Sequence, residues 1–545
     1  MRLRSEKLSL REKIGQCFCV GIPGPDISPE YQKFLNSYKI GNVILFARNI
    51  DNNQQAARLC AKLQEEIYGN TGQKAFIMID QEGGEIIRLK EDAANIPGAM
   101  ALAATGDPEN AYLAGRITGR QLKRLGINFD LAPVLDVNCN PANPVIGVRS
   151  YGADPKQAAV YGNAMMRGLL KEGVLACGKH FPGHGDTALD SHLALPRVDK
   201  PVEELQKTEL YPFREAVKAG IPAVMSAHIL FPTLEPEEVP ATMSRRILTG
   251  LLREEMGFEG LILSDCMEMG AIKEYYGTTE GILRAFEAGV DLVLVSHTRE
   301  AAEEAIRRLE EAVQKGEIAE EVFDRAAERI LSYKEAYLDE SGLNDGRYSA
   351  DENGWQTDRE TAYRLLKKTI TAVNVPPAHI PDGLTEKGPV ENGHSPKGLP
   401  DIGANPVFIG CRAGRFSLVG NEDAQSLCFP ERMAQLLGGT GLIISQDPDE
   451  AELEKIRELA NTHTGMVIGT YNGYMHQGQK DLFRQCADFS VPVIVVALRN
   501  PYDLSELPEN VIGIAAWEYS PRSLDVVAEF LKERKMPEGK MPELT

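Results

Sequence analysis

The sequence predicts an α/β protein in two parts, a (β/α)8 barrel of the TIM type followed by a smaller α/β layered domain. Two observations predict the barrel. Roughly eight short segments are apolar throughout, and amphipathic segments separate most of them. A third observation predicts the second domain, because the same alternation resumes after a long polar stretch. The chain has 545 residues, which is too long for one compact core.

The predicted strands of the first part are apolar along their whole length rather than at alternate positions. Such segments suit a parallel sheet that is buried on both faces, and this many βα units favours a barrel, regular or irregular. A doubly wound open sheet would give the same alternation, so the pattern leaves that architecture open. The segments begin at Ile14, Gly41, Ala75, Ile127, Val174, Ala223, Leu261 and Asp291.

A polar, turn-rich stretch from Leu338 ends the first part, so the barrel domain is predicted over residues 1–337. Residues 338–403 are predicted as a linker, a helix over 359–373 and a long Pro/Gly-rich loop. Residues 404–545 are predicted as the second domain. Its strands are expected to begin at Pro406, Gly441, Gly465, Val491 and Val511, and its helices to cover 451–461, 481–487 and 524–534.

Composition and charge narrow the class of protein. The chain is 43% hydrophobic and 25% charged, as in an ordinary soluble globular protein. A net charge of −20 argues against nucleic acid and against an anionic membrane surface as partners. No apolar run is long enough to span a membrane, and the N-terminal segment has no apolar core of a secretory signal. Nine cysteines without a paired pattern indicate reduced thiols and a cytoplasmic protein, whose oligomeric state the sequence does not fix.

Polar residues stand at the end of four predicted strands. Asp80 ends "AFIMID", Lys179 and His180 lie in "CGKHF", His228 lies in "MSAHI" and Asp265 lies in "LILSDC". In a parallel barrel these strand ends meet at one face, which is the usual place of an active site. The sequence therefore predicts a catalytic mouth there.

The stretch "KHFPGHGDTALDSH", from Lys179 to His192, is unusually rich in titratable groups. His180 and His184 have the spacing of a helical zinc pair, but Pro182 and two glycines disfavour a helix. No phosphate-binding glycine loop or serine nucleophile motif occurs either. We therefore predict neither a metal nor a cofactor.

Asp190 and His192 stand two apart near the end of this stretch. In an extended segment such residues face the same way. A carboxylate beside an imidazole fixes its tautomer and raises its basicity, so the two side chains form a candidate proton-transfer pair.

"KHFPGHGDTALDSH" together with "LILSDCMEMGAI" resembles glycoside hydrolase family 3, nearest to the bacterial β-N-acetylglucosaminidases that process peptidoglycan fragments. Other segments resemble the family in the same order, among them "IDQEGGEIIRL", "GVRSYG" and the C-terminal "VIVVALRNPYDL". The likeness covers nearly the whole chain, and the combination of "KHFPGHG" with "DSH" is highly specific.

The resemblance implies roles for individual residues. Asp265 matches the family's catalytic nucleophile, and Asp190 with His192 matches the dyad that replaces a carboxylic acid/base in this subgroup. Five residues match sugar-binding positions: Asp80, Arg88, Arg149, Lys179 and His180. The chain departs from the family at Glu85, where a basic residue is common, and this puts local loop contacts in doubt.

The activity that the resemblance implies is that of a retaining exo-β-N-acetylglucosaminidase. It would remove terminal GlcNAc from peptidoglycan-derived fragments through a covalent glycosyl-enzyme. A substrate-assisted route is disfavoured because no adjacent acidic pair is seen. The alternatives are a β-N-acetylglucosaminide phosphorylase and a family 3 β-glucosidase, whose acid usually comes from the second domain. A non-catalytic sugar-binding protein is disfavoured because Asp265 and His192 are both present.

Overall fold

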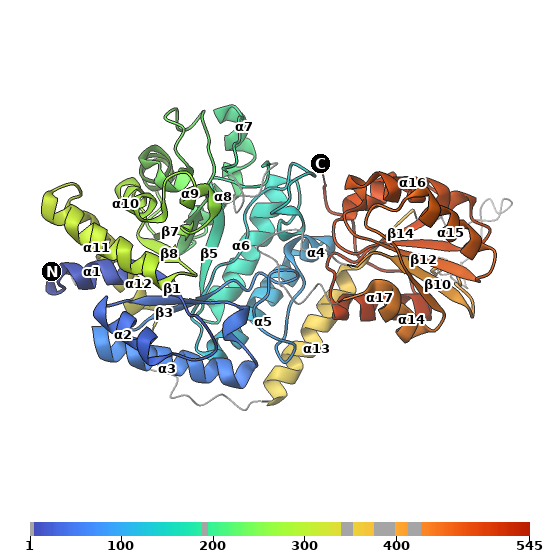
Figure 1. Ribbon diagram of the computed structural model, residues 1–545, viewed down its shortest axis with the longest axis horizontal. Helices are drawn as coiled ribbons and strands as arrows, with labels where there is room; N and C mark the ends of the chain where they lie inside the picture. Colours follow the sequence, from blue (N-terminus) through green and yellow to red (C-terminus); the bar gives the residue numbers. More distant parts are fainter. Residues whose placement is uncertain (1–4, 188–194, 339–351, 375–397, 413–426, 545) are drawn as a thin grey trace, which may run out of the picture.

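The computed structural model describes residues 5–187, 195–338, 352–374, 398–412 and 427–544, and it has two domains side by side (Figure 1). The first is a closed barrel in which strands β1 to β8 pair in chain order. All pairs are parallel, and β1 pairs with both β2 and β8, which closes the sheet. The predicted (β/α)8 barrel with a smaller α/β domain is confirmed, and the open-sheet alternative is wrong.

Each barrel strand lies within one of the segments predicted from sequence. Every residue of β3 and of β5 is buried, which explains why these segments lack polar alternation. The strands are β1 (Phe18–Gly21), β2 (Asn42–Leu45), β3 (Phe76–Ile79), β4 (Phe129–Asp130), β5 (Leu175–Phe181), β6 (Ala223–Ser226), β7 (Leu261–Cys266) and β8 (Leu292–Val295).

Two strand boundaries differ from the prediction. The segment that begins at Ile14 is first a helix, α1 (Leu10–Gln16), because Ser9 caps it in a reciprocal box with Glu12. The predicted strand from Ile127 is reduced to β4, two residues long, and Pro133 beyond it has no N–H to offer the ladder.

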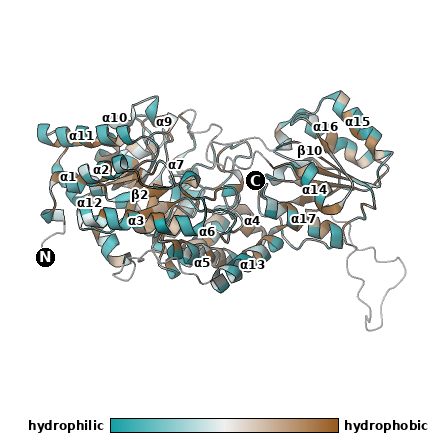
Figure 2. Cartoon of the chain, turned by 60° about the horizontal axis from the view of Figure 1, so that its bottom comes forward, coloured by the Kyte–Doolittle hydropathy of each residue, from teal (hydrophilic) through white to brown (hydrophobic). Residues whose placement is uncertain are grey.

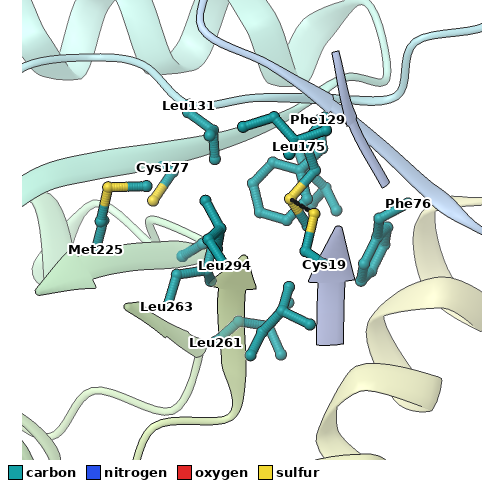
Figure 3. Packing of buried hydrophobic residues seen from close by; sticks show 14 of the residues in the cluster. Cys19, Phe76, Phe129, Leu131, Leu175, Cys177, Met225, Leu261, Leu263 and Leu294 are labelled. Atoms are coloured by element: carbon teal, nitrogen blue, oxygen red, sulfur yellow. Dashed lines mark hydrogen bonds between the residues drawn. The ribbon is translucent and has the colours of Figure 1, made fainter. Parts of the chain in front are cut away.

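The inside of the barrel is a packed core (Figure 3). Cys19 Sγ lies 3.6 Å from Met78 Sδ, and the rings of Phe76 and Phe129 meet edge to face at 5.4 Å. Leu294 from the last strand joins them in the same buried cluster. The barrel is therefore no channel, and polar chemistry is confined to its ends.

Helices cover the outside of the barrel, and their outer faces are hydrophilic, as α11 shows (Figure 2). No helix within the described ranges has the length and apolar character to cross a membrane. The helices are α2 (Pro29–Ser37), α3 (Asn53–Thr71), α4 (Ala99–Ala104), α5 (Pro108–Leu125), α6 (Pro155–Lys171), α7 (Val202–Lys207), α8 (Leu210–Lys218), the π-helix η5 (Arg246–Glu255), α9 (Gly270–Lys273), α10 (Thr278–Ala288), α11 (Arg299–Lys315) and α12 (Glu320–Tyr337).

The second domain is a six-stranded sheet with the order β11-β10-β12-β13-β14-β9, flanked by helices. Its parallel strands are β10 (Pro406–Gly410), β11 (Thr440–Ile443), β12 (Gly465–Thr470), β13 (Val493–Ala497) and β14 (Ile512–Ala515). Its helices are α14 (Phe429–Leu437), which the sequence did not predict, α15 (Glu450–Ala460), α16 (Gln477–Gln485) and α17 (Pro521–Glu533).

The helix predicted over 359–373 ends earlier than expected. α13 (Glu352–Thr369) is followed by a short strand, β9 (Thr371–Val373), which pairs antiparallel with β14. The β-branched residues Thr371 and Val373 favour the extended backbone. The sheet thus gains an edge strand from the segment predicted as linker and helix.

The two domains lie side by side (Figure 1), and buried apolar side chains of both form one cluster. Met100 and Ala104 of α4 lie in one buried cluster with second-domain residues such as Val407 and Met466. α13 contributes to both cores, because Trp355 packs into the barrel cluster and Ile370, just after the helix, packs into a second-domain cluster.

Candidate active site

Polar side chains gather where the barrel strands end. Asp80 follows β3, Lys179 and His180 lie near the end of β5, and Asp265 lies near the end of β7. His228 follows β6 by two residues. Because the strands are parallel and closed into a barrel, these positions share one rim.

The Lys179 ammonium bridges two carboxylates at this rim. Its Nζ lies 2.6 Å from Asp80 Oδ1 and 2.7 Å from Glu82 Oε1, and its side chain is 2% exposed. Burial lowers the pKa of Lys179, but the charges of Asp80 and Glu82 outweigh it and raise the pKa above its ordinary value. Lys179 is therefore charged, and these two carboxylates use two of its three N–H donors.

Arg149 holds the other side of Glu82. Its Nε and Nη2 donate to the two oxygens of Glu82 at 2.9 and 2.8 Å, and its Nη1 donates to the Val145 carbonyl at 3.1 Å. A guanidinium has five N–H donors, so two remain for a ligand. Burial raises the pKa of Glu82, but Arg149 and Lys179 together hold it below its ordinary value.

Arg88 completes the group. Its Nη2 lies 4.0 Å from Asp80 Oδ2. Its backbone N–H donates to Gln81 Oε1 at 2.8 Å, which folds the loop after β3 back toward the rim. We call Asp80, Glu82, Arg88, Arg149 and Lys179 the rim cluster. It joins two carboxylates to three cations, an arrangement of donors and acceptors suited to sugar hydroxyl groups.

His180 is held by a buried carboxylate. Its Nδ1 lies 2.7 Å from Asp136 Oδ2, and its backbone N–H also donates to Asp136 at 3.1 Å. Burial raises the pKa of Asp136, but His180 outweighs it and the pKa lies below its ordinary value. The ionised Asp136 accepts from the Nδ1 side and fixes the orientation of the ring, so that Nε2 is the ring nitrogen on the other side.

His184 has a structural role. β5 ends at Phe181, so His180 and His184 do not share a helix face. His184 Nδ1 lies 2.8 Å from Thr187 Oγ1, and burial lowers its pKa to about 4. The imidazole is therefore neutral.

One group of possible metal ligands occurs within the described part of the chain: Cys139, Asp186 and Glu209. The Lys200 ammonium already lies among them. Its Nζ is 2.6 Å from Glu209 Oε1, 3.2 Å from Asp186 Oδ2 and 3.2 Å from Cys139 Sγ. The Lys200 ammonium therefore stands where a metal ion would have to bind.

Asp265 presents a partly exposed carboxylate at the rim. Its Oδ1 accepts the Cys266 N–H at 2.7 Å. His228 lies beneath this turn, with Nε2 3.0 Å from the Cys266 carbonyl and Nδ1 2.9 Å from Thr242 Oγ1. His228, which the sequence analysis placed at a strand end, thus supports the backbone that carries Asp265.

Asp190 and His192 lie outside the described residues. The chain before them is fixed, because Asn143 Nδ2 donates to the His184 carbonyl at 2.7 Å and to Thr187 Oγ1 at 3.3 Å. The predicted proton-transfer pair remains a prediction from sequence.

The sequence analysis missed two carboxylates of this candidate site. Glu82 lies two residues after Asp80, so the i, i+2 spacing of "DQE" was a signal that could have found it. Asp136 lies inside the segment predicted as one continuous strand, and its partner His180 lies far along the chain. The atypical Glu85 pairs with Arg499 of the second domain, whose Nε lies 2.6 Å from Glu85 Oε1.

Activity is expected to survive exhaustive treatment with EDTA. His180 and His184 bind Asp136 and Thr187, and an ammonium lies among the other candidate ligands. The check is the initial rate on an aryl glycoside before and after metal removal, with addition of Zn²⁺ as the counter-test. A loss of activity that Zn²⁺ restores would overturn this reading of the histidines.

Comparisons with known proteins agree with one another. The family model described as the N-terminal domain of glycosyl hydrolase family 3 matches residues 9–333. "Beta-hexosaminidase A" of Pseudoalteromonas piscicida is 36% identical over 330 residues, which cover 56% of this chain and 55% of that protein, so the chain matches about half the length of that relative. A "Beta-hexosaminidase" of Thiobacillus denitrificans is 35% identical over 53% of this chain and 80% of that protein. The structure of a family 3 β-N-acetylglucosaminidase from Paenibacillus covers 98% of this chain and 99% of that chain, with a TM-score of 0.84 and 36% identity.

Proposed function

The chain belongs to glycoside hydrolase family 3, and from that premise we propose that it is a retaining exo-β-N-acetylglucosaminidase. The single observation that carries the proposal is the rim cluster, which lies on the same barrel rim as Asp265. The β-hexosaminidase relatives and the Paenibacillus neighbour support the acetylglucosaminide specificity.

The rim cluster would bind the terminal sugar. Asp80 and Glu82 accept hydrogen bonds from hydroxyl groups, while the unused N–H groups of Lys179 and Arg149 donate them. His180 would add its Nε2, because Asp136 holds the Nδ1 side of the ring. These side chains are buried, except for the half-buried Asp80, and ion pairs cross-link them, so the site is formed before the sugar arrives.

Asp265 would be the nucleophile. Its carboxylate attacks the anomeric carbon, the bond to the leaving oxygen breaks, and a covalent glycosyl-enzyme forms. His192, tuned by Asp190, donates the proton to the leaving oxygen and then removes one from the attacking water. Two displacements at one carbon retain its configuration.

A second candidate is phosphorolysis of the same glycosides. The proposed acid/base is an imidazole, which repels an incoming phosphate less than a carboxylate would. Inorganic phosphate could then take the place of water in the second displacement. A family 3 β-glucosidase is the other alternative. It would differ from the proposed enzyme in the sugar that it removes, whereas a phosphorylase would differ in the acceptor, phosphate instead of water.

We propose peptidoglycan-derived fragments with a terminal GlcNAc as the natural substrates and the cytoplasm as the location. All nine cysteines are free thiols, which suits a reducing compartment. The resemblance of the "KHFPGHG" and "DSH" segments supports the choice of substrate.

The aryl β-N-acetylglucosaminide is expected to be the preferred substrate among matched β-N-acetylglucosaminide, β-glucoside and β-xyloside. The advantage in kcat/KM should be at least about tenfold, the scale of one well-made polar contact. Each assay is run with and without phosphate, and the product is identified as sugar or sugar phosphate. Faster turnover of the β-glucoside would replace this proposal by the glucosidase, and phosphate-dependent release of a sugar phosphate would establish the phosphorylase.

A further inference from the structure

One short 3-10 helix touches both the rim cluster and the second domain. This helix, η3 (Gly147–Arg149), carries Arg149 at its end, where the guanidinium reaches Glu82. Its central residue, Val148, lies in the apolar cluster that α4 forms with the second-domain strands. Its first residue, Gly147, is so near the second domain that an added Cβ would lie 3.2 Å from Asn500 Oδ1.

Asn138 fixes the first residue of this helix. Asn138 is wholly buried, and its Oδ1 accepts the Gly147 N–H at 3.0 Å. Its Nδ2 donates to the Tyr502 hydroxyl at 2.7 Å. Tyr502 lies in η10 (Pro501–Glu506) of the second domain, shortly after β13. The Gly147 N–H fixes which way the amide faces, because a flipped amide would direct an N–H at it, and the Tyr502 hydroxyl holds the amide in place from the second-domain side.

We propose that the second domain contributes to sugar binding through Tyr502, which positions Arg149 by way of Asn138 and η3. Tyr502 touches neither the proposed sugar nor the reacting atoms, so it is a positioning residue. The inference rests on the proposed function, since it assigns Arg149 to the sugar. It gives the second domain a task other than supplying an acid.

The neighbouring loop is supported from the same side. The Arg499 side chain, buried at the domain junction, pairs with Glu85, which lies three residues after Glu82. Both partners of the Glu82–Arg149 ion pair therefore sit on segments that the second domain contacts. Arg149 donates to Glu82 with two nitrogens, so a small displacement of either segment would disturb both bonds.

Tyr502→Phe is the main test. It removes one hydroxyl, keeps the ring and leaves the buried Asn138 Nδ2 without its partner. Because Arg149 binds substrate and transition state alike, KM for the aryl β-N-acetylglucosaminide should rise about tenfold while kcat stays within about twofold. The dissociation constant of free GlcNAc, measured by calorimetry, should rise by the same factor.

Tyr474→Phe is the matched control. Its hydroxyl also crosses from the second domain to the barrel, donating to the Pro141 carbonyl at 2.7 Å, and its ring lies 5.3 Å from that of Tyr502. Among the described residues, the Tyr474 hydroxyl makes no hydrogen bond to Asn138 or η3, so KM should remain within about twofold of wild type even if Tm falls as much as in Tyr502→Phe. Equal changes in KM for the two variants would reduce Tyr502 to a structural contact and overturn the inference.

Val148→Ala provides a second variant that acts on η3 from its apolar side. It should raise KM in the same direction as Tyr502→Phe with kcat little changed. Unaltered KM and GlcNAc affinity in folded Tyr502→Phe and Val148→Ala proteins would also overturn the inference. Its failure is distinct from that of the proposed function, which would appear in the wild-type protein as faster turnover of the β-glucoside or as no turnover of any acetylglucosaminide.

Discussion

Asp265→Asn should lower hydrolysis of the aryl β-N-acetylglucosaminide at least ~10³-fold, because the proposed covalent route needs a carboxylate. The fold should survive. Asparagine has nearly the same volume and keeps an oxygen for the Cys266 N–H, which Asp265 Oδ1 accepts at 2.7 Å. The measurements are kcat for both proteins and mass spectrometry of wild-type protein after exposure to a mechanism-based fluorosugar, which should label Asp265.

Glu274→Gln offers a matched control for this change. It also converts a carboxylate to an amide shortly after β7, but at an exposed position at the end of α9. Its activity should stay near that of wild type. Near-normal hydrolysis by Asp265→Asn, or a fluorosugar label on another residue, would remove Asp265 from the role of nucleophile.

His192→Ala should reduce kcat by roughly 10²- to 10⁴-fold for glycosides with poor leaving groups, the usual range for loss of a general acid. The effect should be much smaller for activated aryl leaving groups, which depart without a proton. The measurement is kcat across a series of leaving-group pKa values, with azide added as a small nucleophile. Uniform loss on every leaving group, together with no rescue by azide, would exclude proton transfer by His192.

Two companion variants in the same series separate the acid/base from sugar binding. Asp190→Ala should show the His192→Ala pattern more weakly, because a carboxylate beside the imidazole only orients it and tunes its basicity. Lys179→Ala should lower kcat/KM for good and poor leaving groups alike. It removes the contacts of the ammonium with the sugar and its ion pairs with Asp80 and Glu82.

The barrel could be predicted from sequence because burial on both faces leaves a direct trace, the unbroken apolar segment. Closure of the sheet left no such trace. β1 and β8 pair across nearly the whole length of the domain, and an open sheet has the same local pattern. β9 was missed for a similar reason, since three residues after a long helix become a strand only when β14 lies beside them.

The candidate site likewise has residues that a local sequence pattern predicts and contacts between distant segments that it does not. Asp80, Lys179 and Asp265 could be predicted because each follows an apolar strand in a fold that gathers strand ends. The bidentate ion pair of Arg149 with Glu82 joins residues that are far apart in sequence, so no local sequence pattern predicts it. Glu85 stands where the family commonly has a basic residue. In the structure it forms an ion pair with Arg499 of the second domain, which the sequence did not predict.

α13 has a consequence for how the molecule gains its stability. Trp355 near the start of the helix is wholly buried in the barrel core, while Leu366 near its end is buried in a second-domain core. A helix forms cooperatively, so fraying at one end weakens the other. The free energies of unfolding of the barrel and of the second domain are therefore coupled. A substitution that destabilises one core is expected to destabilise the other domain too.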